Sequence, residues 1–521
     1  MASGRAPVDL DLPLHLDRAS DRPLHRQIVA QVRDAIRAGQ LPAGTRLPST
    51  RRLGATLAVT RNVAVAAYAD LVAEGYLTGS HGSGTYVEAT LPPFPRPALP
   101  PPTRLPRWLH AEHDPPVVDA QLSPRGIDFR LGIPSLSPLA LDPWRRAWRD
   151  VVTVPPPTGY GPPAGLPALR AAIARYLGRS RGLACGPDDV VITAGASHAL
   201  ALIARATLAP GDPAALEDPG YPTARRILRA HGVQLLPVPV DDDGLRVDAL
   251  PRGPSAPLLV YATPSHQYPL GVRLSVARRL ALLEWARAHD SLIVEDDYDS
   301  EFRFDAPPLP ALAGLEADGY VAYIGTFSKV LTPALRVGYL VAPAPLRRRV
   351  EEIKRAADDH PPWPVEQALT AFIAGGDLDR HIRRMRRHYA RKRAALVAAL
   401  APVGHLATVR GLEAGLHTYL ELRADLDPES IVRQAQDQGV VVTTLDAYYQ
   451  AAPDRQGLLL GYGGLEERDV ARGAGILADV IAREATVRKP RRGRLPSRPR
   501  QRGGSVQASP SVGRASSNDS V

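Results

Sequence analysis

The hydrophobic pattern predicts a first folded unit over residues 22–88. Four apolar side chains recur there at every fourth position, which is the spacing of one buried helix face: Leu24, Ile28, Val32 and Ile36. A second helix is expected to begin near Ser49, and a third to run from Thr60 to about Ala73, because Ser and Thr are preferred N-cap residues. Two short strands, 75–77 and 85–87, flank a glycine-rich loop. Three helices followed by such a hairpin form a winged helix-turn-helix.

From residue 129 onwards the pattern alternates between strands and helices, which predicts an α/β unit. The strand at 190–193 runs into residues 194–198, whose small side chains let backbone N–H groups approach an anion at a helix N-terminus. The apolar run 291–294 is followed directly by Glu295, Asp296 and Asp297. These carboxylates are therefore expected at the C-terminal end of a strand, where open α/β sheets bind their ligands.

Two further segments cannot pack into either unit. Eight prolines lie between Pro92 and Pro106, so residues 89–126 are expected to form an extended linker. Residues 486–521 hold nine cations and one acid, are rich in Pro, Gly and Ser, and are expected to form a disordered basic tail. The tail supplies most of the net charge of +10. We accordingly expect four regions, at residues 1–88, 89–126, 127–485 and 486–521.

The composition narrows the class of protein. A lone cysteine, Cys185, excludes an internal disulfide and fits a reducing compartment. No apolar run approaches the length of about 18 residues that a membrane-spanning helix requires, and the N-terminus has no signal-peptide pattern. We therefore expect a cytoplasmic protein.

The charge within the winged unit is unevenly distributed. Residues 41–69 carry four arginines and no acid, although the whole unit is nearly neutral. A surface that faces nucleic-acid phosphates needs this local asymmetry, so the unit is predicted to bind double-stranded DNA, the alternative being a contact with protein. Arg51 and Arg61 begin successive predicted helices and are the strongest candidates. The full set of candidate DNA contacts is Ser49, Arg51, Arg52, Thr60, Arg61, Asn62 and, on the wing, His81.

One lysine is conspicuous in a chain with four lysines and sixty arginines. Lys329 follows a short hydroxyl-bearing loop that contains Thr326 and Ser328. An amine can lose its proton and form a Schiff base, whereas a guanidinium stays protonated. Seven residues further on, Arg336 offers a planar fork for a phosphate. Taken alone, Lys329 could equally be an ordinary surface lysine, but these neighbours favour a chemical role.

Short motifs in both units carry a family resemblance. They lie at residues 23–28, 47–49, 60–62, 73–77 and 82–87 in the first unit, and at 217–221, 263–271, 295–298 and 325–329 in the second. The first set resembles the DNA-binding domain of GntR-family regulators. The second resembles the fold-type I domain of aspartate aminotransferase, with a mostly parallel sheet, a smaller C-terminal α/β subdomain and bound pyridoxal 5'-phosphate (PLP). Together they resemble the MocR subfamily of GntR regulators.

The resemblance implies roles for individual residues. Lys329 forms the Schiff base with PLP, Asp296 pairs with the pyridinium nitrogen, and Tyr298 meets the ring hydroxyl. Asp297 is an alternative to Asp296. The other implied cofactor contacts are Tyr221 on the ring face, Tyr268 on the ring-hydroxyl loop, and Ala196, Ser197, Thr326, Ser328 and Arg336 around the phosphate; no metal is implied.

Two departures from the aminotransferase pattern concern the substrate side of the site. Tyr268 precedes Pro269 where most aminotransferases have Asn-Pro. Near the C-terminus, Gly457 stands where aminotransferases carry an arginine for the substrate carboxylate, and Arg455 lies two residues early. The cofactor set is therefore complete, whereas the substrate anchor is in doubt.

The resemblance leads to two functional hypotheses. The first is a homodimeric transcriptional regulator that senses PLP, or an amino compound reacting with PLP, and controls genes of vitamin B6 or amino-acid metabolism. The second is an active PLP-dependent aminotransferase with an appended DNA-binding domain. The long linker would allow the winged domains to exchange across a homodimer.

Overall fold

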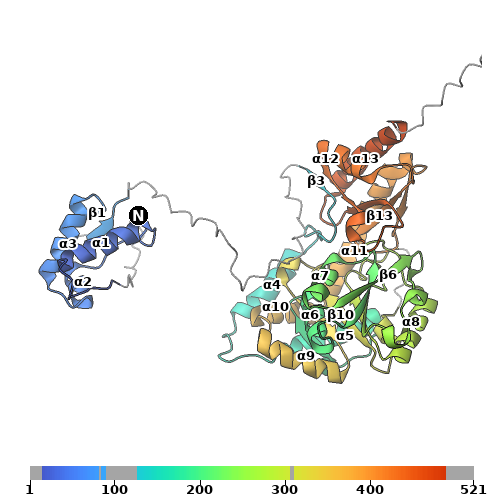
Figure 1. Ribbon diagram of the computed structural model, residues 1–521, viewed down its shortest axis with the longest axis horizontal. Helices are drawn as coiled ribbons and strands as arrows, with labels where there is room; N and C mark the ends of the chain where they lie inside the picture. Colours follow the sequence, from blue (N-terminus) through green and yellow to red (C-terminus); the bar gives the residue numbers. More distant parts are fainter. Residues whose placement is uncertain (1–13, 81–83, 90–125, 305–309, 488–521) are drawn as a thin grey trace, which may run out of the picture. The chain divides into compact units, whose positions relative to one another are not determined.

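The computed structural model describes residues 14–80, 84–89, 126–304 and 310–487, and it divides into two compact units, residues 1–113 and 114–521 (Figure 1). The division falls within the predicted linker. Most of that linker, His81 and the tail from residue 488 onwards lie outside the described residues. Within the described ranges, no helix is long and apolar enough to cross a membrane.

The first unit packs three helices against a hairpin. The helices are α1 (Leu24–Arg37), α2 (Thr50–Thr56) and α3 (Arg61–Ala73), and the antiparallel strands are β1 (Leu77–Ser80) and β2 (Gly84–Val87). The helical periodicity predicted which side chains form the core, since Ile28, Val32 and Ile36 are buried against Ala67 and Leu71. The predicted winged helix-turn-helix is thus confirmed.

One predicted N-cap of this unit is present, and two other details differ from the expectation. Ser49 caps α2 as predicted, because its hydroxyl accepts a hydrogen bond from the Arg52 backbone N–H at 3.2 Å. Thr60 occupies the N-cap position of α3, but its side chain makes no capping hydrogen bond. Strand β1 begins at Leu77 rather than at Gly75, because Gly75 adopts φ +78° and belongs to the turn that follows α3.

The second unit is built on a sheet that has eight strands among the described residues, in the order β4-β11-β10-β9-β8-β5-β6-β7. Strands β10, β9, β8, β5 and β6 run parallel to their neighbours, β11 is antiparallel to both β10 and β4, and β7 is antiparallel to β6. The mostly parallel sheet is therefore confirmed. Its strands are β4 (Val190–Thr193), β5 (Pro213–Asp218), β6 (Gln234–Asp241), β7 (Gly244–Leu245), β8 (Leu259–Ala262), β9 (Leu292–Asp297), β10 (Val321–Thr326) and β11 (Gly338–Val341).

Helices cover both faces of this sheet. Successive residues of β4 point to opposite faces of the sheet, and both faces are packed. Val190 and Ile192 belong to one apolar cluster, and Val191 belongs to another. Every residue of β4, β8, β10 and β11 is buried, which explains why these strands read as continuous apolar runs. The helices of this part are α4 (Leu141–Val152), α5 (Pro167–Arg181), α6 (Ala196–Thr207), α7 (Pro222–Ala230), α8 (Val276–His289), α9 (Ala344–Ala357) and α10 (Trp363–Ala374).

A smaller subdomain completes the second unit, and Figure 1 shows its orange and red elements gathered at one end of that unit. It contains an antiparallel sheet in the order β12-β13-β16-β15 and a parallel pair, β3 with β14. The long helix α11 (Asp377–Leu400) packs against the C-terminal helix α13 (Glu467–Val487). The remaining elements are β3 (Ile127–Asp128), β12 (Ala407–Arg410), β13 (His417–Leu422), α12 (Pro428–Asp437), β14 (Val440–Val441), β15 (Thr443–Thr444) and β16 (Gly457–Gly461).

Candidate functional site

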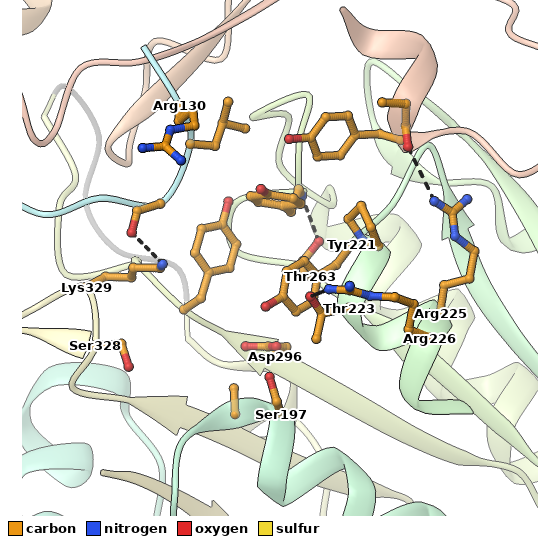
Figure 2. Close-up of a pocket in the computed structure, with 18 of the residues that line it drawn as sticks. Arg130, Ser197, Tyr221, Thr223, Arg225, Arg226, Thr263, Asp296, Ser328 and Lys329 are labelled. Atoms are coloured by element: carbon orange, nitrogen blue, oxygen red, sulfur yellow. Dashed lines mark hydrogen bonds between the residues drawn. The ribbon is translucent and has the colours of Figure 1, made fainter. Parts of the chain in front are cut away.

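A cavity of about 1010 Å3 opens where parallel strands of the large sheet end (Figure 2). The loops that follow β5, β8, β9 and β10 meet there, as expected for a ligand site in an α/β sheet. The cavity brings together all ten residues predicted to bind the cofactor: Ala196, Ser197, Tyr221, Tyr268, Asp296, Tyr298, Thr326, Ser328, Lys329 and Arg336. Their individual roles remain predictions.

Lys329 lies three residues beyond the end of β10 and is partly buried. Its Nζ donates a hydrogen bond to the Gly132 carbonyl oxygen at 2.6 Å. Burial lowers the pKa of the amine, and the carboxylates of Asp299 and Asp296 oppose that shift. A Cβ at residue 132, where φ is +81°, would lie 2.7 Å from Nζ, so only glycine leaves the amine this space. A lowered pKa favours the neutral, nucleophilic form of the amine.

Asp296 and Asp297 are the last two residues of β9, and their side chains point to opposite faces of the sheet. Asp296 faces the cavity, where its Oδ2 accepts a hydrogen bond from the Tyr261 hydroxyl at 2.6 Å and its Oδ1 has no partner among the described residues. Burial raises the pKa of Asp296 to about 7. Asp297 instead forms a buried ion pair with Arg181 and accepts a hydrogen bond from Tyr323. Of the two carboxylates, only that of Asp296 lines the cavity.

The N-terminus of α6 forms one wall of the cavity. Gly195 precedes the helix with φ +97°, and Ala196 and Ser197 of the first turn line the cavity. A Cβ on Gly195 would lie 3.3 Å from the Arg336 guanidinium, so glycine allows this close approach. Backbone N–H groups of a first helical turn have no partner within the helix and suit an anion.

Hydroxyl groups and a guanidinium stand beside that helix. The Thr326 hydroxyl donates to the Ser328 hydroxyl oxygen at 3.0 Å, and the Ser328 backbone N–H donates to Thr326 Oγ1 at 3.2 Å. Arg336 Nη2 donates to the Ala194 carbonyl oxygen at 2.6 Å, which holds the guanidinium against the start of α6. The predicted phosphate contacts therefore converge on one small region of the cavity wall.

Tyrosine side chains gather on another side of the cavity. The ring centroids of Tyr221 and Tyr268 lie 5.3 Å apart, and those of Tyr268 and Tyr298 lie 5.6 Å apart. His266 Nδ1 lies 3.0 Å from the Asp299 carboxylate and 3.0 Å from the Tyr298 hydroxyl. Since an ionised carboxylate only accepts hydrogen bonds, Nδ1 carries the hydrogen, and the Tyr298 oxygen is its second acceptor. The proton of the Tyr298 hydroxyl is then available to a ligand.

Several cavity residues were not predicted from the sequence. Tyr261 belongs to β8 and reaches Asp296 only through the pairing of β8 with β9. Arg130 enters from the segment that follows β3, and Arg225 and Arg226 enter from α7. The sequence did contain a clue to Arg225 and Arg226, because they lie about one helical turn beyond Tyr221, which was itself a predicted cofactor contact.

The position expected for a substrate-binding arginine is blocked. Gly457 begins β16 and is buried, and a Cβ there would lie 2.3 Å from the Leu420 carbonyl oxygen and 2.5 Å from the Tyr419 ring. Arg455 does not line the cavity and forms an ion pair with Asp242, with Nη1 2.8 Å from Oδ1. Strand β16 itself contains no arginine, and Arg455, two residues before it, does not line the cavity.

In the winged unit, the predicted DNA contacts lie on the surface of α2, α3 and their caps. Arg51 lies in the first turn of α2, and Arg61 is the first residue of α3. The side chains of both make no hydrogen bond or ion pair with the part of the chain that the structure describes, so their guanidinium groups are available to a partner. The exposed candidates are Ser49, Arg51, Arg52, Thr60, Arg61 and Asn62.

Comparison with known proteins covers both units. Residues 24–87 match the family model of bacterial regulatory proteins of the gntR family, and residues 131–455 match that of class I and II aminotransferases. The chain is 37% identical over 471 residues to the probable rhizopine catabolism regulatory protein MocR of Rhizobium meliloti, covering 88% of this chain and 94% of that protein. It is 36% identical over 457 residues to the pyridoxine biosynthesis transcriptional regulator PdxR of Corynebacterium glutamicum, covering 88% of this chain and 96% of that protein.

The chain belongs to the MocR-type regulators of the GntR family. The second unit of this MocR-type regulator has the fold of solved aminotransferases. The kynurenine aminotransferase of Pyrococcus horikoshii has a TM-score of 0.64 at 27% identity, with 69% of this chain and 91% of that chain covered. The α-aminoadipate aminotransferase LysN of Thermus thermophilus, solved with a phosphopyridoxyl-leucine compound, has a TM-score of 0.62 at 27% identity, with 70% of this chain and 93% of that chain covered.

The cavity of this MocR-type regulator fits PLP. A pyridinium nitrogen needs a buried anionic acceptor, and Asp296 Oδ1 is buried without a partner among the described residues. A phosphate needs cationic and N–H donors, which Arg336 and the first turn of α6 offer. The amine of Lys329 lines the same cavity. Together with the aminotransferase fold, these features make the second unit a PLP-binding unit.

Proposed function

We propose that this MocR-type regulator binds a DNA operator through its winged unit and senses PLP, or an amino compound that reacts with PLP, in the cavity of its second unit. Its target genes belong to vitamin B6 or amino-acid metabolism. The relative that is named as a regulator of pyridoxine biosynthesis supports the first class of target, and the relative that is named as a regulator of rhizopine catabolism supports metabolic control more generally.

The observation that carries this proposal is a complete cofactor cavity without a substrate anchor on β16. Any side chain at residue 457 would collide with the neighbouring strand, and Arg455 is held by Asp242 outside the cavity. An amino acid could enter, but no guanidinium of β16 would hold its carboxylate in reacting geometry. A misplacement of about 1 Å can cost about a hundredfold in rate, so the cavity suits binding better than turnover.

The residues of the cavity would share the work of holding the cofactor. PLP supplies an electrophilic carbonyl carbon that reacts with amines. Lys329 provides the amine for covalent attachment, and burial, which lowers its pKa, keeps that amine reactive. Asp296 would hold a proton on the ring nitrogen, and Tyr298 would donate its hydroxyl hydrogen to the ring oxygen.

Association of two chains is part of the proposal. Aminotransferase-fold proteins commonly dimerise, and DNA operators are commonly bound by dimers of helix-turn-helix proteins. The eight prolines between residues 92 and 106 favour an extended spacer, which would let a winged unit reach across such a homodimer.

A transamination assay separates the regulator from the alternative, an active aminotransferase. We expect wild-type protein loaded with PLP to turn over common amino acids and keto acids far below the typical enzyme rate of about 10 per second. The Arg455→Ala variant should behave as the wild type, because Arg455 does not line the cavity. Ordinary turnover in the wild type would make the protein an enzyme with a DNA-binding arm, and its loss in Arg455→Ala would identify the missing anchor.

A further inference from the structure

A buried histidine and a buried aspartate stand behind Tyr298, outside the cavity. His266 belongs to the loop 263–271, and Asp299 follows Tyr298 in the chain. Neither of the two lines the cavity. The His266 side chain is 2% exposed and that of Asp299 is fully buried. Polar groups buried this deeply need hydrogen-bond partners, and these two contact each other and the tyrosine.

The contacts give His266 the part of a donor. Its Nδ1 lies 3.0 Å from Asp299 Oδ2 and 3.0 Å from the Tyr298 hydroxyl oxygen. An ionised carboxylate can only accept, so Nδ1 carries the hydrogen and faces both oxygens. His266 Nε2 has no partner among the described residues, so the ring is fixed by hydrogen bonding through Nδ1. The Tyr298 hydroxyl therefore turns its own hydrogen away from Nδ1, towards the cavity that this tyrosine lines.

Backbone and ring packing hold the histidine in this orientation. Gly415, at φ +84°, lies between β12 and β13 of the small subdomain. A Cβ there would collide with His266 Cε1 and lie 2.6 Å from Asp299 Oδ2, so glycine lets the subdomain close over the pair. The His266 ring centroid lies 5.1 Å from that of His417 and 5.9 Å from that of Tyr298. This packing restricts rotation of the imidazole.

The neighbours of the pair do not compete for the hydrogen on Nδ1. Burial lowers the pKa of His417 to about 3, so its ring is neutral, and its Nε2 donates to the Pro269 carbonyl oxygen at 3.2 Å. Burial raises the pKa of Tyr298 and that of Tyr268 well above the usual value, so both phenols keep their hydrogens. Asp299 therefore decides which nitrogen of His266 carries the hydrogen.

We propose that His266 and Asp299 are positioning residues that act through Tyr298 and set the hydrogen bond between this tyrosine and the ring oxygen of the cofactor. The inference rests on the proposed role of Tyr298 and extends it to two residues outside the cavity. A hydrogen bond donated to the ring oxygen stabilises its negative charge. It thereby lowers the pH at which the lysine-bound cofactor loses its proton.

A pH titration of the visible absorbance of the PLP-loaded full-length protein tests the inference. We expect His266→Leu to raise the midpoint of this titration by roughly one pH unit, the effect of one hydrogen bond to a charged group. Tyr298→Phe should raise the midpoint by at least as much. In the Tyr298→Phe background, His266→Leu should cause no further shift, because the histidine acts through the tyrosine hydroxyl.

His266→Asn is the matched control, because the asparagine Nδ2 takes the position of the imidazole Nδ1 and still donates. Its midpoint should stay at the wild-type value. Asp299→Asn keeps the shape of the carboxylate but no longer fixes the hydrogen on Nδ1, so its midpoint should shift in the same direction as that of His266→Leu. This variant carries the test should His266→Leu fail to fold.

The outcomes separate this inference from the proposal on which it rests. An unchanged midpoint in folded His266→Leu, or a shift of equal size with and without the Tyr298 hydroxyl, would overturn the inference alone. An unchanged midpoint in Tyr298→Phe would overturn the proposed role of Tyr298 as well. Wild-type protein that acquires no visible absorbance with PLP would contradict the attachment of the cofactor to Lys329.

Discussion

Asp296 and Asp297 show how one step along a strand separates two electrostatic roles. The Asp297 carboxylate is neutralised by Arg181 in a buried ion pair. The Asp296 carboxylate is equally buried, but its only hydrogen-bond donor among the described residues is the neutral Tyr261 hydroxyl. A cation beside Asp296 would remove the cost of burying its charge, which is what a protonated pyridine ring offers.

This contrast predicts opposite effects of two amide substitutions in the PLP-free protein. Burial raises the pKa of Asp296 to about 7, above its usual value of about 4. Asp296 therefore does not oppose folding below about pH 4, where its carboxyl is neutral in both states. As the pH rises through 7 the protein loses stability at this group, because the carboxyl ionises at a lower pH in the unfolded chain than in the folded one. Above about pH 7, Asp296→Asn should raise the free energy of unfolding by up to roughly 4 kcal/mol, and the melting temperature with it. Below about pH 4 both should be unchanged. The same variant should retain PLP more weakly.

Asp297→Asn should instead destabilise the protein at neutral pH, by about 3 kcal/mol, because it leaves Arg181 buried without its anion. Thermal melts and PLP retention of the two variants, measured side by side, check both statements. If Asp297→Asn loses PLP at unchanged stability, the wrong aspartate has been assigned to the ring nitrogen.

At the scale of single elements, α2 and α3 present arginines at their starts on the surface of the winged unit. Arg51 and Arg61 are exposed, and their side chains make no hydrogen bond or ion pair within the described part of the chain, whereas Arg26 on α1 pairs with Asp70. Both guanidinium groups are therefore available to phosphates or base edges.

Arg51→Ala and Arg61→Ala should each weaken operator binding without changing the visible absorbance of the bound cofactor. An arginine that reads a base contributes about 1–3 kcal/mol of discrimination, whereas one that meets a phosphate weakens all sequences alike and lowers the salt slope by about one. Fluorescence anisotropy on specific and random duplexes at several salt concentrations distinguishes the two. Arg26→Ala is the matched control in the same unit. Wild-type affinity in both variants would mean that these helices do not read DNA.

Features that depend on local sequence could be predicted from the sequence, whereas features that depend on the packing of distant segments could not. Helices α1 to α3 follow from local periodicity and caps, and Asp296 and Lys329 follow from their places after apolar strands. Tyr261 and Arg226 depend on strand register and on the rotation of α7, which local sequence does not encode. The obstruction at Gly457 depends on a neighbouring strand, so the sequence showed a missing arginine but not the lack of room for one.

At the scale of the whole molecule, the account requires that the two units influence one another. A ligand of the second unit can change DNA affinity only if it binds the DNA-competent state and the other state unequally. Such coupling typically amounts to about 1–3 kcal/mol, and it is reciprocal, so DNA must change the affinity for the ligand by the same factor. A protein in which the cavity served catalysis alone would show no such coupling.

The most direct measurement is the affinity of the full-length protein for its operator, determined by fluorescence anisotropy in the PLP-free and the PLP-loaded form, each with and without a small amino compound, β-alanine. We predict that PLP, or β-alanine added to the PLP-loaded protein, changes the dissociation constant about fivefold to 150-fold, and that Lys329→Ala loses the response to β-alanine. Equal affinities under all four conditions, in protein that demonstrably binds PLP, would contradict the central claim that this cavity is a sensor.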